Sequence, residues 1–195
     1  MLTHARVGLV VVDLSTADPR SSVRIHAALA ERGVQFLDAG ISGGAAAAEK
    51  GSLTLMVGGD RDALARVTPV LERFAAKIVH MGAPGSGHVT KVLNNFLNGV
   101  ALAATSEVMV AGRRAGLDLD RLLEVLNASS GVNFATQNRF PKIIHGDYLE
   151  GGLTGELMAK DIRLYLNYMA GIGVPTFSGP ACLAAFELSD RKSVV

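Results

Sequence analysis

The first 80 residues alternate apolar runs with stretches of helical periodicity. Val7–Val12 is a continuous apolar run rich in β-branched residues, which is typical of a strand buried on both faces. Three further strands are expected, at Val34–Asp38, Leu53–Val57 and Lys77–Met81. Helices are expected from Asp18-Pro19 to Gly33, through the alanine run after Gly44, and from Asp60 to about Phe74. Strands separated by helices in this way predict a mainly parallel sheet.

The pattern changes after Gly82, where no further strand is indicated. A long helix is expected from about Gly87 to Arg114, ending at Gly116. Four more helices are expected, from Asp118 to Leu126, within residues 133–144, from Glu156 to Ala170 and from Pro180 to Leu188. The sequence therefore predicts an α/β domain over residues 1–81 and an all-helical domain over residues 82–195.

The apolar content adds an expectation about assembly. Hydrophobic residues make up 49% of the 195 residues and the mean hydropathy is +0.30, which favours burial of apolar surface between subunits. A membrane would be another place for that surface, but polar side chains interrupt the longest apolar stretch, Phe96–Gly112, so no spanning helix is expected. We therefore expect a homo-oligomer that does not enter a membrane.

Charge and residue counts exclude other classes. The net charge of +1 comes with no cluster of Lys and Arg, so nucleic acid is not an expected partner. The five histidines show no ligand spacing with cysteine or carboxylates, so no metal is expected. The single cysteine, Cys182, lies in an apolar run and is expected in the core. Val7–Val12 is too short for the core of a signal peptide, and a reducing cytoplasm fits these features.

A polar stripe on the long helix is the strongest local signal of chemistry. His88, Lys91, Asn95 and Asn98 are spaced so that they share one face of a helix that is otherwise largely apolar. A lysine in such a stripe faces a polar cleft or a partner, because an unpaired buried charge is costly. The alternative is that the stripe is the solvent-facing side of the helix, and the periodicity leaves both open.

Three loops could bind a ligand. Ser42-Gly43-Gly44 follows a predicted strand, where open α/β sheets bind ligands and where glycines let backbone N–H groups approach a carboxylate. The loop at 13–16 also follows a strand. The third loop, 82–87, reads G-x-x-G-x-G and matches neither the dinucleotide pattern nor the P-loop, so it is either an anion-binding turn or a flexible interdomain turn.

Four segments together carry a family resemblance: VVDLSTADP, FLDAGISGGAAAAEKGSLTLMVGGD, HMGAPGSGHVTKVLNN and LMAKDI. In their order and approximate spacing they resemble the β-hydroxyacid dehydrogenase family, which includes 3-hydroxyisobutyrate dehydrogenases and is related to 6-phosphogluconate dehydrogenase. The resemblance spans roughly residues 7–188. It implies an incomplete Rossmann-type parallel sheet with a C-terminal helical domain, an NAD or NADP cofactor and a small hydroxy-acid substrate.

The resemblance also implies residue roles. Lys91 would be the catalytic acid/base and Asn95 its helper near the substrate. The substrate carboxylate would be held by Ser42, Gly43 and Gly44. The nicotinamide end of the cofactor would be bound by Ser15, Thr16 and Lys160. From its position in a helix alone, the Lys160-Asp161 pair is expected on a solvated, ion-rich face.

The sequence departs from the family pattern at both ends. Family members begin with a strand, a G-x-G-x-x-G loop and a helix that are absent here, and the residues after Leu188 do not continue the usual final segment. Three functions stay open: a dehydrogenase with weak cofactor binding alone, a non-catalytic remnant that dimerises, or a small-carboxylate-binding module using Ser-Gly-Gly and the helix N-terminus. The sequence also leaves open whether the chain is a fragment or a natural short form.

Overall fold

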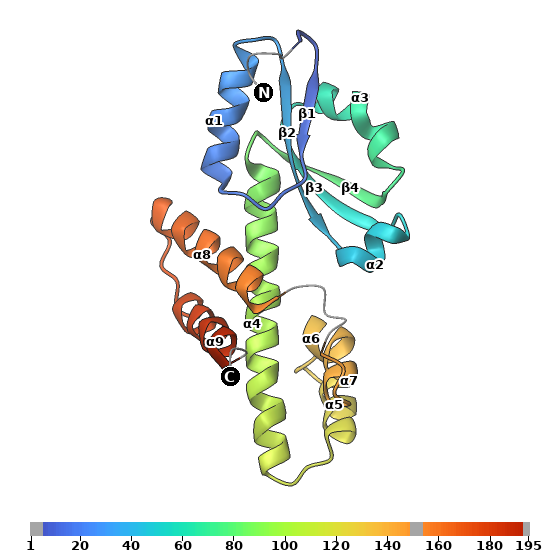
Figure 1. Cartoon of the computed structure of the whole chain (residues 1–195), viewed down its shortest axis with the longest axis vertical. Coiled ribbons are helices and arrows are strands. Elements are labelled where there is room, and N and C mark those ends of the chain that lie inside the picture. The colour runs from blue at the N-terminus through green and yellow to red at the C-terminus, as the bar shows by residue number, and fades with distance from the viewer. Residues whose placement is uncertain (1–5, 149–153, 193–195) are drawn as a thin grey trace. The chain divides into compact units, whose positions relative to one another are not determined.

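The computed structural model describes residues 6–148 and 154–192 and contains two compact units, residues 1–94 and 95–195 (Figure 1). The first unit is α/β and the second is helical, as the sequence predicts. The division falls within the long helix α4 (Ser86–Arg114), which begins in the first unit and continues through the second.

Four strands form the sheet of the first unit. They are β1 (Val10–Asp13), β2 (Gln35–Ser42), β3 (Leu53–Gly58) and β4 (Ala75–Gly82), hydrogen-bonded to one another in that order. Each lies where an apolar run predicts a strand. β1 begins later than predicted, at Val10 instead of Val7, because a turn at Gly8 with a φ of 82° interrupts the run.

The prediction of a mainly parallel sheet is wrong for the central pair of strands. β1 pairs with β2 and β3 with β4 in parallel, but β2 and β3 are antiparallel, with Ala39 opposite Val57. Residues 43–52 connect them through the short helix α2 (Gly44–Glu49). This connection is shorter than the dozen or more residues that a parallel crossover needs, so the sheet is mixed.

Helices cover both faces of the sheet. Besides α2 and the first turns of α4, they are α1 (Pro19–Ala30) and α3 (Arg61–Leu71), which lie on opposite sides in Figure 1. Side chains alternate along β2: Leu37 joins the main core with α3, whereas Phe36 packs in a smaller cluster with Leu29 of α1. By the same alternation, Asp38 and Gly40 lie on the face of Phe36.

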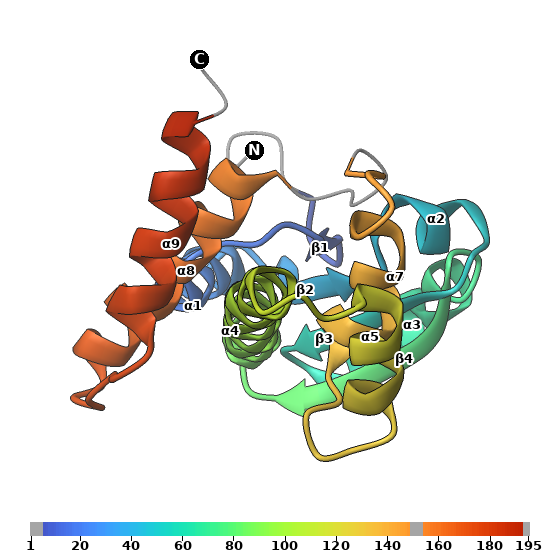
Figure 2. The same cartoon turned by 90° about the horizontal axis from the view of Figure 1, so that it is seen from below.

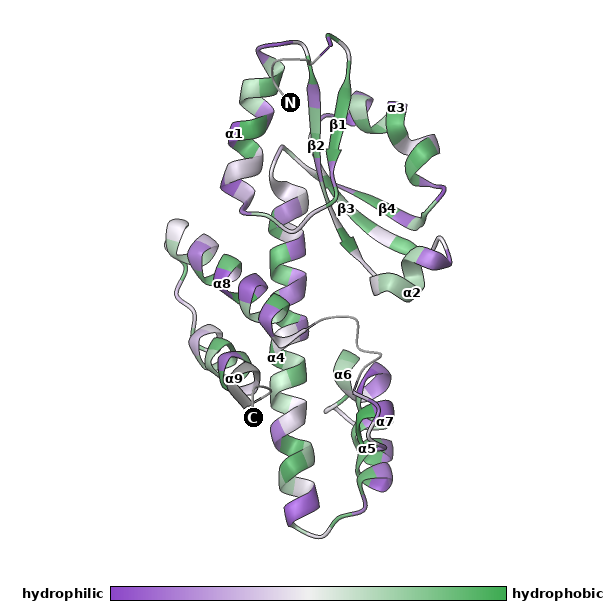
Figure 3. Cartoon of the chain, in the orientation of Figure 1, coloured by the Kyte–Doolittle hydropathy of each residue, from purple (hydrophilic) through white to green (hydrophobic). Residues whose placement is uncertain are grey.

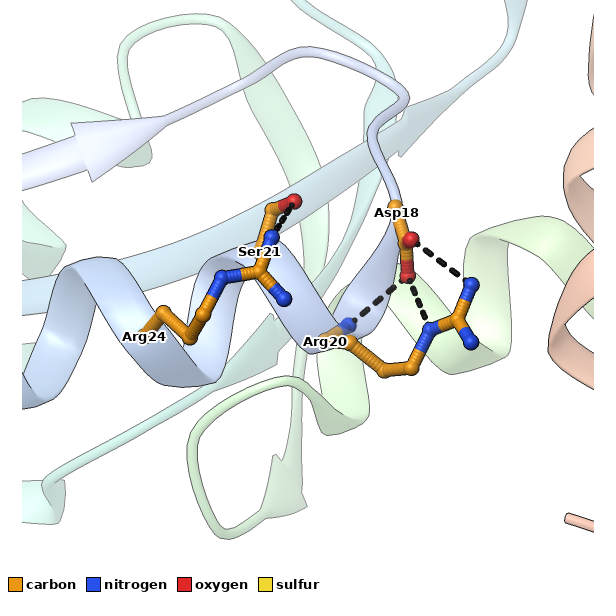
Figure 4. A network of polar contacts seen from close by, with 4 residues as sticks. All are labelled: Asp18, Arg20, Ser21 and Arg24. Carbon is orange, nitrogen blue, oxygen red and sulfur yellow. Dashed lines mark hydrogen bonds and ion pairs between the residues drawn. The ribbon is translucent and has the colours of Figure 1, made fainter. Parts of the chain in front are cut away.

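Asp18 is the N-cap of α1, at the point where the sequence predicts that this helix begins. The carboxylate of Asp18 accepts hydrogen bonds from the backbone N–H of Arg20 at 2.9 Å and from its guanidinium at 3.0 and 3.1 Å (Figure 4). One turn further, Arg24 donates to the hydroxyl of Ser21 (Figure 4). These contacts fix the start of α1 directly after the loop that follows β1.

The second unit contains the rest of α4 and further helices. They are α5 (Leu119–Asn127), α6 (Phe134–Asn138), α7 (Phe140–Ile143), α8 (Gly155–Gly171) and α9 (Gly179–Lys192). Asp118 caps α5 as predicted, whereas the single helix predicted within residues 133–144 is two short ones. α8 and α9 run side by side in Figures 1 and 2, with Ile162 and Phe186 in their core. Cys182 is buried in that core, as predicted.

Within residues 6–148 and 154–192, none of the helices combines the length and apolar character that crossing a bilayer requires. Apolar residues nevertheless recur along much of α4 (Figure 3).

Candidate active site

α4 crosses the sheet so closely that glycine is required on both sides of the contact. A Cβ on Gly87 would lie 2.3 Å from the carbonyl oxygen of Asp38 and 2.4 Å from that of Met56. A Cβ on Gly58 would lie 2.7 Å from the backbone nitrogen of Gly87. The glycines at 58 and 87 therefore let the backbone of the helix rest on the backbone of the strands.

Lys91 lies over β2 in the same contact. A Cβ on Gly40 would lie 2.4 Å from Cβ and 2.9 Å from Cγ of Lys91, so the stem of the lysine occupies the space above this glycine. α4 starts beside Asp38 and passes Gly40, so its first turns follow β2 towards Ser42. Lys91 is half-buried.

The polar stripe is not a solvent face. His88 is fully buried and Asn95 is 6% exposed, and Lys91 lies between them on the helix. Asn98 is half-buried. The alternative that the stripe simply faces water is therefore wrong for His88 and Asn95.

The Ser42-Gly43-Gly44 turn ends β2 and starts α2. Its two glycines have φ values of 129° and 69°, which side chains with a Cβ rarely adopt. Both glycines are exposed, and the space where Gly44 would carry a Cβ is open. Backbone groups are therefore accessible at this turn, as binding of a small carboxylate requires.

The loop after β1 opens at the same edge of the sheet, because the carboxyl ends of two parallel strands share an edge. Asp13 shapes this loop by accepting a hydrogen bond from the backbone N–H of Ser15 at 2.9 Å. Ser15 is exposed and Thr16 is half-buried. Ser15 is therefore accessible at this edge of the sheet.

The start of α4 is not an external anion site. The carboxylate of Asp38, which is fully buried, accepts from the backbone N–H groups of Gly85 at 2.7 Å and His88 at 2.8 Å. An internal carboxylate thus occupies the position where a helix N-terminus would hold a bound anion. The expectation of an anion-binding turn at 82–87 is therefore wrong, because Asp38 already accepts from the N–H groups that a bound anion would need.

In the second unit, Asn95 belongs to a buried polar cluster. Its amide Nδ2 donates to Oδ2 of Asp161 at 2.5 Å, and Nζ of Lys160 lies 3.0 Å from the other oxygen of the same carboxylate. Asp161 is 3% exposed whereas Lys160 is exposed. The expectation of a solvated face is wrong for Asp161, because the helix turns that residue inward to meet Asn95.

Sequence reasoning missed the roles of Asp38, Asp161 and Ser22. Asp38 lies inside the quoted FLDAGISGG segment, and Asp161 inside LMAKDI, so a charged residue within a largely apolar stretch was the available signal. Ser22, hydrogen-bonded to His88, carries no such signal. Among the residues that the structure describes, no group of three or more His, Cys, Asp or Glu side chains could hold a metal ion.

Two protein-family models match nearly the whole chain. Residues 1–82 match the NAD binding domain of 6-phosphogluconate dehydrogenase. Residues 85–193 match the domain described as NAD-binding of NADP-dependent 3-hydroxyisobutyrate dehydrogenase.

Individual proteins agree with these models. The NAD-dependent L-serine dehydrogenase of Pseudomonas aeruginosa is 39% identical over 96% of this chain, which covers 65% of that protein. The mitochondrial 3-hydroxyisobutyrate dehydrogenase of Mus musculus is 36% identical over 98% of this chain, which covers 59% of that protein. The Mycobacterium tuberculosis 3-hydroxyisobutyrate dehydrogenase, solved with L-serine, superposes with a TM-score of 0.89 and 31% identity, over 96% of this chain and 66% of that one.

The chain therefore spans less than two thirds of the length of these relatives. Both domain models, the sequence identities and the superposition nevertheless agree with one another, and the chain belongs to the 3-hydroxyisobutyrate, or β-hydroxyacid, dehydrogenase family, whose members use NAD(P)+.

Proposed function

We propose that this chain carries the substrate-binding and acid–base part of an NAD(P)-dependent β-hydroxyacid dehydrogenase. The supporting observation is that the side chain of Lys91 packs directly over Gly40. This glycine lies in the strand that ends at the Ser42-Gly43-Gly44 turn. A small hydroxy acid whose carboxylate is bound by the backbone of that turn would extend its hydroxyl along β2 towards Lys91. The names of the relatives indicate a substrate of about the size of 3-hydroxyisobutyrate or L-serine.

Oxidation of such an alcohol requires removal of the hydroxyl proton. In the proposal, the neutral amine of Lys91 accepts this proton as the carbon–oxygen double bond forms, and returns it in the reverse direction. A nicotinamide bound there would supply the acceptor for the hydride that leaves the carbon carrying the hydroxyl. Asn95 lies one helical turn from Lys91 and assists it by hydrogen bonding near the substrate.

Asp161 supports this role of Asn95. Because Nδ2 donates to the buried carboxylate of Asp161, the amide plane of Asn95 is held in one orientation. The same carboxylate holds the ammonium group of Lys160. We assign Lys160, with Ser15 and Thr16, to the nicotinamide end of the cofactor.

Binding and turnover test the proposal separately. Titration of the 15N-labelled chain with 3-hydroxyisobutyrate and L-serine should shift the backbone resonances of Ser42–Gly44. Lys91→Ala should keep that binding and abolish turnover when the chain is fused to the glycine-loop segment with which members of the family begin, and Lys77→Ala, on β4, is the matched control. Absence of carboxylate binding at millimolar concentration together with an inactive fusion contradicts the proposal.

A second function is a non-catalytic, dimerising protein. It is supported by exposed apolar residues on α4, such as Leu97 and Val108. In either case we expect a homo-oligomer acting in the cytoplasm, with a small hydroxy acid or carboxylate as its ligand.

A further inference from the structure

A buried serine–histidine pair joins α1 to α4. Nδ1 of His88 and the hydroxyl of Ser22 lie 2.7 Å apart, and the two residues are 0% and 1% exposed. Among the residues that the structure describes, no other group forms a hydrogen bond with the imidazole, whose Nε2 is also buried. The family chemistry proposed above uses neither residue.

The starts of α1 and α4, on either side of this pair, are closely packed against each other. A Cβ on Gly85, directly before α4, would lie 2.9 Å from Cγ2 of Val23 and 3.1 Å from the carbonyl oxygen of Pro19. On its other side, the start of α4 is hydrogen-bonded to the carboxylate of Asp38. The first turn of α4 therefore lies between β2 and the first turn of α1, and a shift of either contact moves it.

Each helix start leads to part of the proposed site. α1 begins directly after the loop that contains Ser15 and Thr16, and its cap at Asp18 keeps that connection short. On α4, Lys91 follows His88 by less than one turn, so the two residues move together. The hydrogen bond between Ser22 and His88 thus links the loop on one side to the lysine on the other.

We infer that Ser22 and His88 are positioning residues, whose buried hydrogen bond sets the position of the Ser15–Thr16 loop relative to Lys91. The inference rests on the proposed function for the roles of those three residues. Its physical basis is that a buried imidazole deprived of its partner is costly, so the helices rearrange instead of leaving the ring unpaired.

Ser22→Ala tests the inference, with Ser21→Ala as the matched control. Ser21 is the neighbouring residue of α1, and its hydroxyl only accepts a bond from Arg24 among the contacts described. In the ligand-free chain, Ser22→Ala should shift the backbone amide resonance of Thr16 and the 13Cε resonance of Lys91. The Lys91 resonance is assigned by its absence from the spectrum of Lys91→Arg. Ser21→Ala should leave both resonances unchanged. The backbone N–H of His88 should exchange with solvent about tenfold faster in Ser22→Ala than in the unaltered chain. This factor corresponds to a decrease of about 1.4 kcal/mol in the free energy of local opening.

Ser22→Cys covers the case in which Ser22→Ala does not fold. The thiol is similar in size and a weaker hydrogen-bonding group, so the same two resonances should move in the same direction by a smaller amount. Shifts confined to the neighbours of Ser22 and His88, with Thr16 and Lys91 unchanged in a folded variant, overturn the inference. Because these resonances are recorded without substrate or cofactor, an inactive chain contradicts only the proposed function.

Discussion

At the scale of single residues, the contact of Gly40 with Lys91 is one of the close contacts of the candidate site. Gly40→Ala introduces a Cβ 2.4 Å from Cβ of the lysine, so α4 must move off β2. Overpacking of this kind costs about 1–3 kcal/mol, which urea unfolding measures. Gly155→Ala is the control, because its Cβ meets only Ser189 at an ordinary 3.4 Å; equal stability of both variants would disprove the close contact.

A second prediction at this scale concerns how the free energy of unfolding changes at acidic pH. Side-chain hydrogen bonds from Arg20 hold the pKa of the Asp18 carboxyl below its usual range. A depressed carboxyl pKa contributes stability that is fully present above the unfolded value and is lost as the pH falls through the folded value. Asp18→Asn keeps an N-capping oxygen without a charge, so its stability should change less between pH 5 and about pH 3. An unchanged pH profile would exclude this contribution.

Single residues also show what the sequence could predict. Ser42–Gly44 and Lys91 carry recognisable motifs, and in the structure Lys91 of α4 packs over Gly40, in the strand that ends at Ser42. The role of Asp38 depends on N–H groups of Gly85 and His88 that are distant in sequence, which no local pattern encodes. Burial of Asp161 likewise depends on how α8 rotates against Asn95.

At the scale of elements, apolar runs predict where strands lie because burial on both faces requires continuous hydrophobicity. They do not predict direction, which for β2 and β3 was decided by the length of the segment 43–52. Short helices such as α6 and α7 also escape the periodicity, because few turns give few repeats.

The prediction at the scale of elements concerns the hydrogen bond that joins Asn95 of α4 to Asp161 of α8. Asp161→Ala removes the buried carboxylate that accepts a hydrogen bond from Asn95, and the loss of such a buried hydrogen bond costs about 1–3 kcal/mol. Thermal and urea unfolding should show the loss. Asn167→Ala, an exposed change on the same helix, should stay within about 0.5 kcal/mol of the unaltered chain. Comparable losses for both variants would mean that the Asp161 contact adds nothing.

At the scale of the whole molecule, α4 carries an apolar face towards solvent. Leu97 is 69% and Val108 45% exposed, and with Ala104, also exposed, they are spaced along one side of the helix. We expect this face to pair with a second copy of the chain. Leu97→Lys with Val108→Lys should shift sedimentation from dimer to monomer, whereas Val70→Lys, an exposed change on α3, should not. A monomeric unaltered chain at micromolar concentration rules the expectation out.

The whole chain also determines how well the cofactor can bind. In the first unit, Asp18, Asp60 and Asp38 each place a carboxylate at a helix start, of α1, α3 and α4 respectively. A phosphate at any of these helix starts would meet a negative charge in place of free N–H groups. The sequence contains no G-x-G-x-x-G loop as an alternative seat for the pyrophosphate.

We therefore expect this chain alone to bind NAD and NADP at least about a thousandfold more weakly than a chain with the glycine loop, or by about 4 kcal/mol. The reason is that adenosine and pyrophosphate supply much of the binding energy that places the reacting ring. Calorimetric titration of both cofactors should show no micromolar binding to this chain, and fusion to the glycine-loop segment with which members of the family begin should restore it. Micromolar binding by the chain alone, with turnover lost in Lys91→Ala, would instead show a working enzyme that seats its cofactor by a different route.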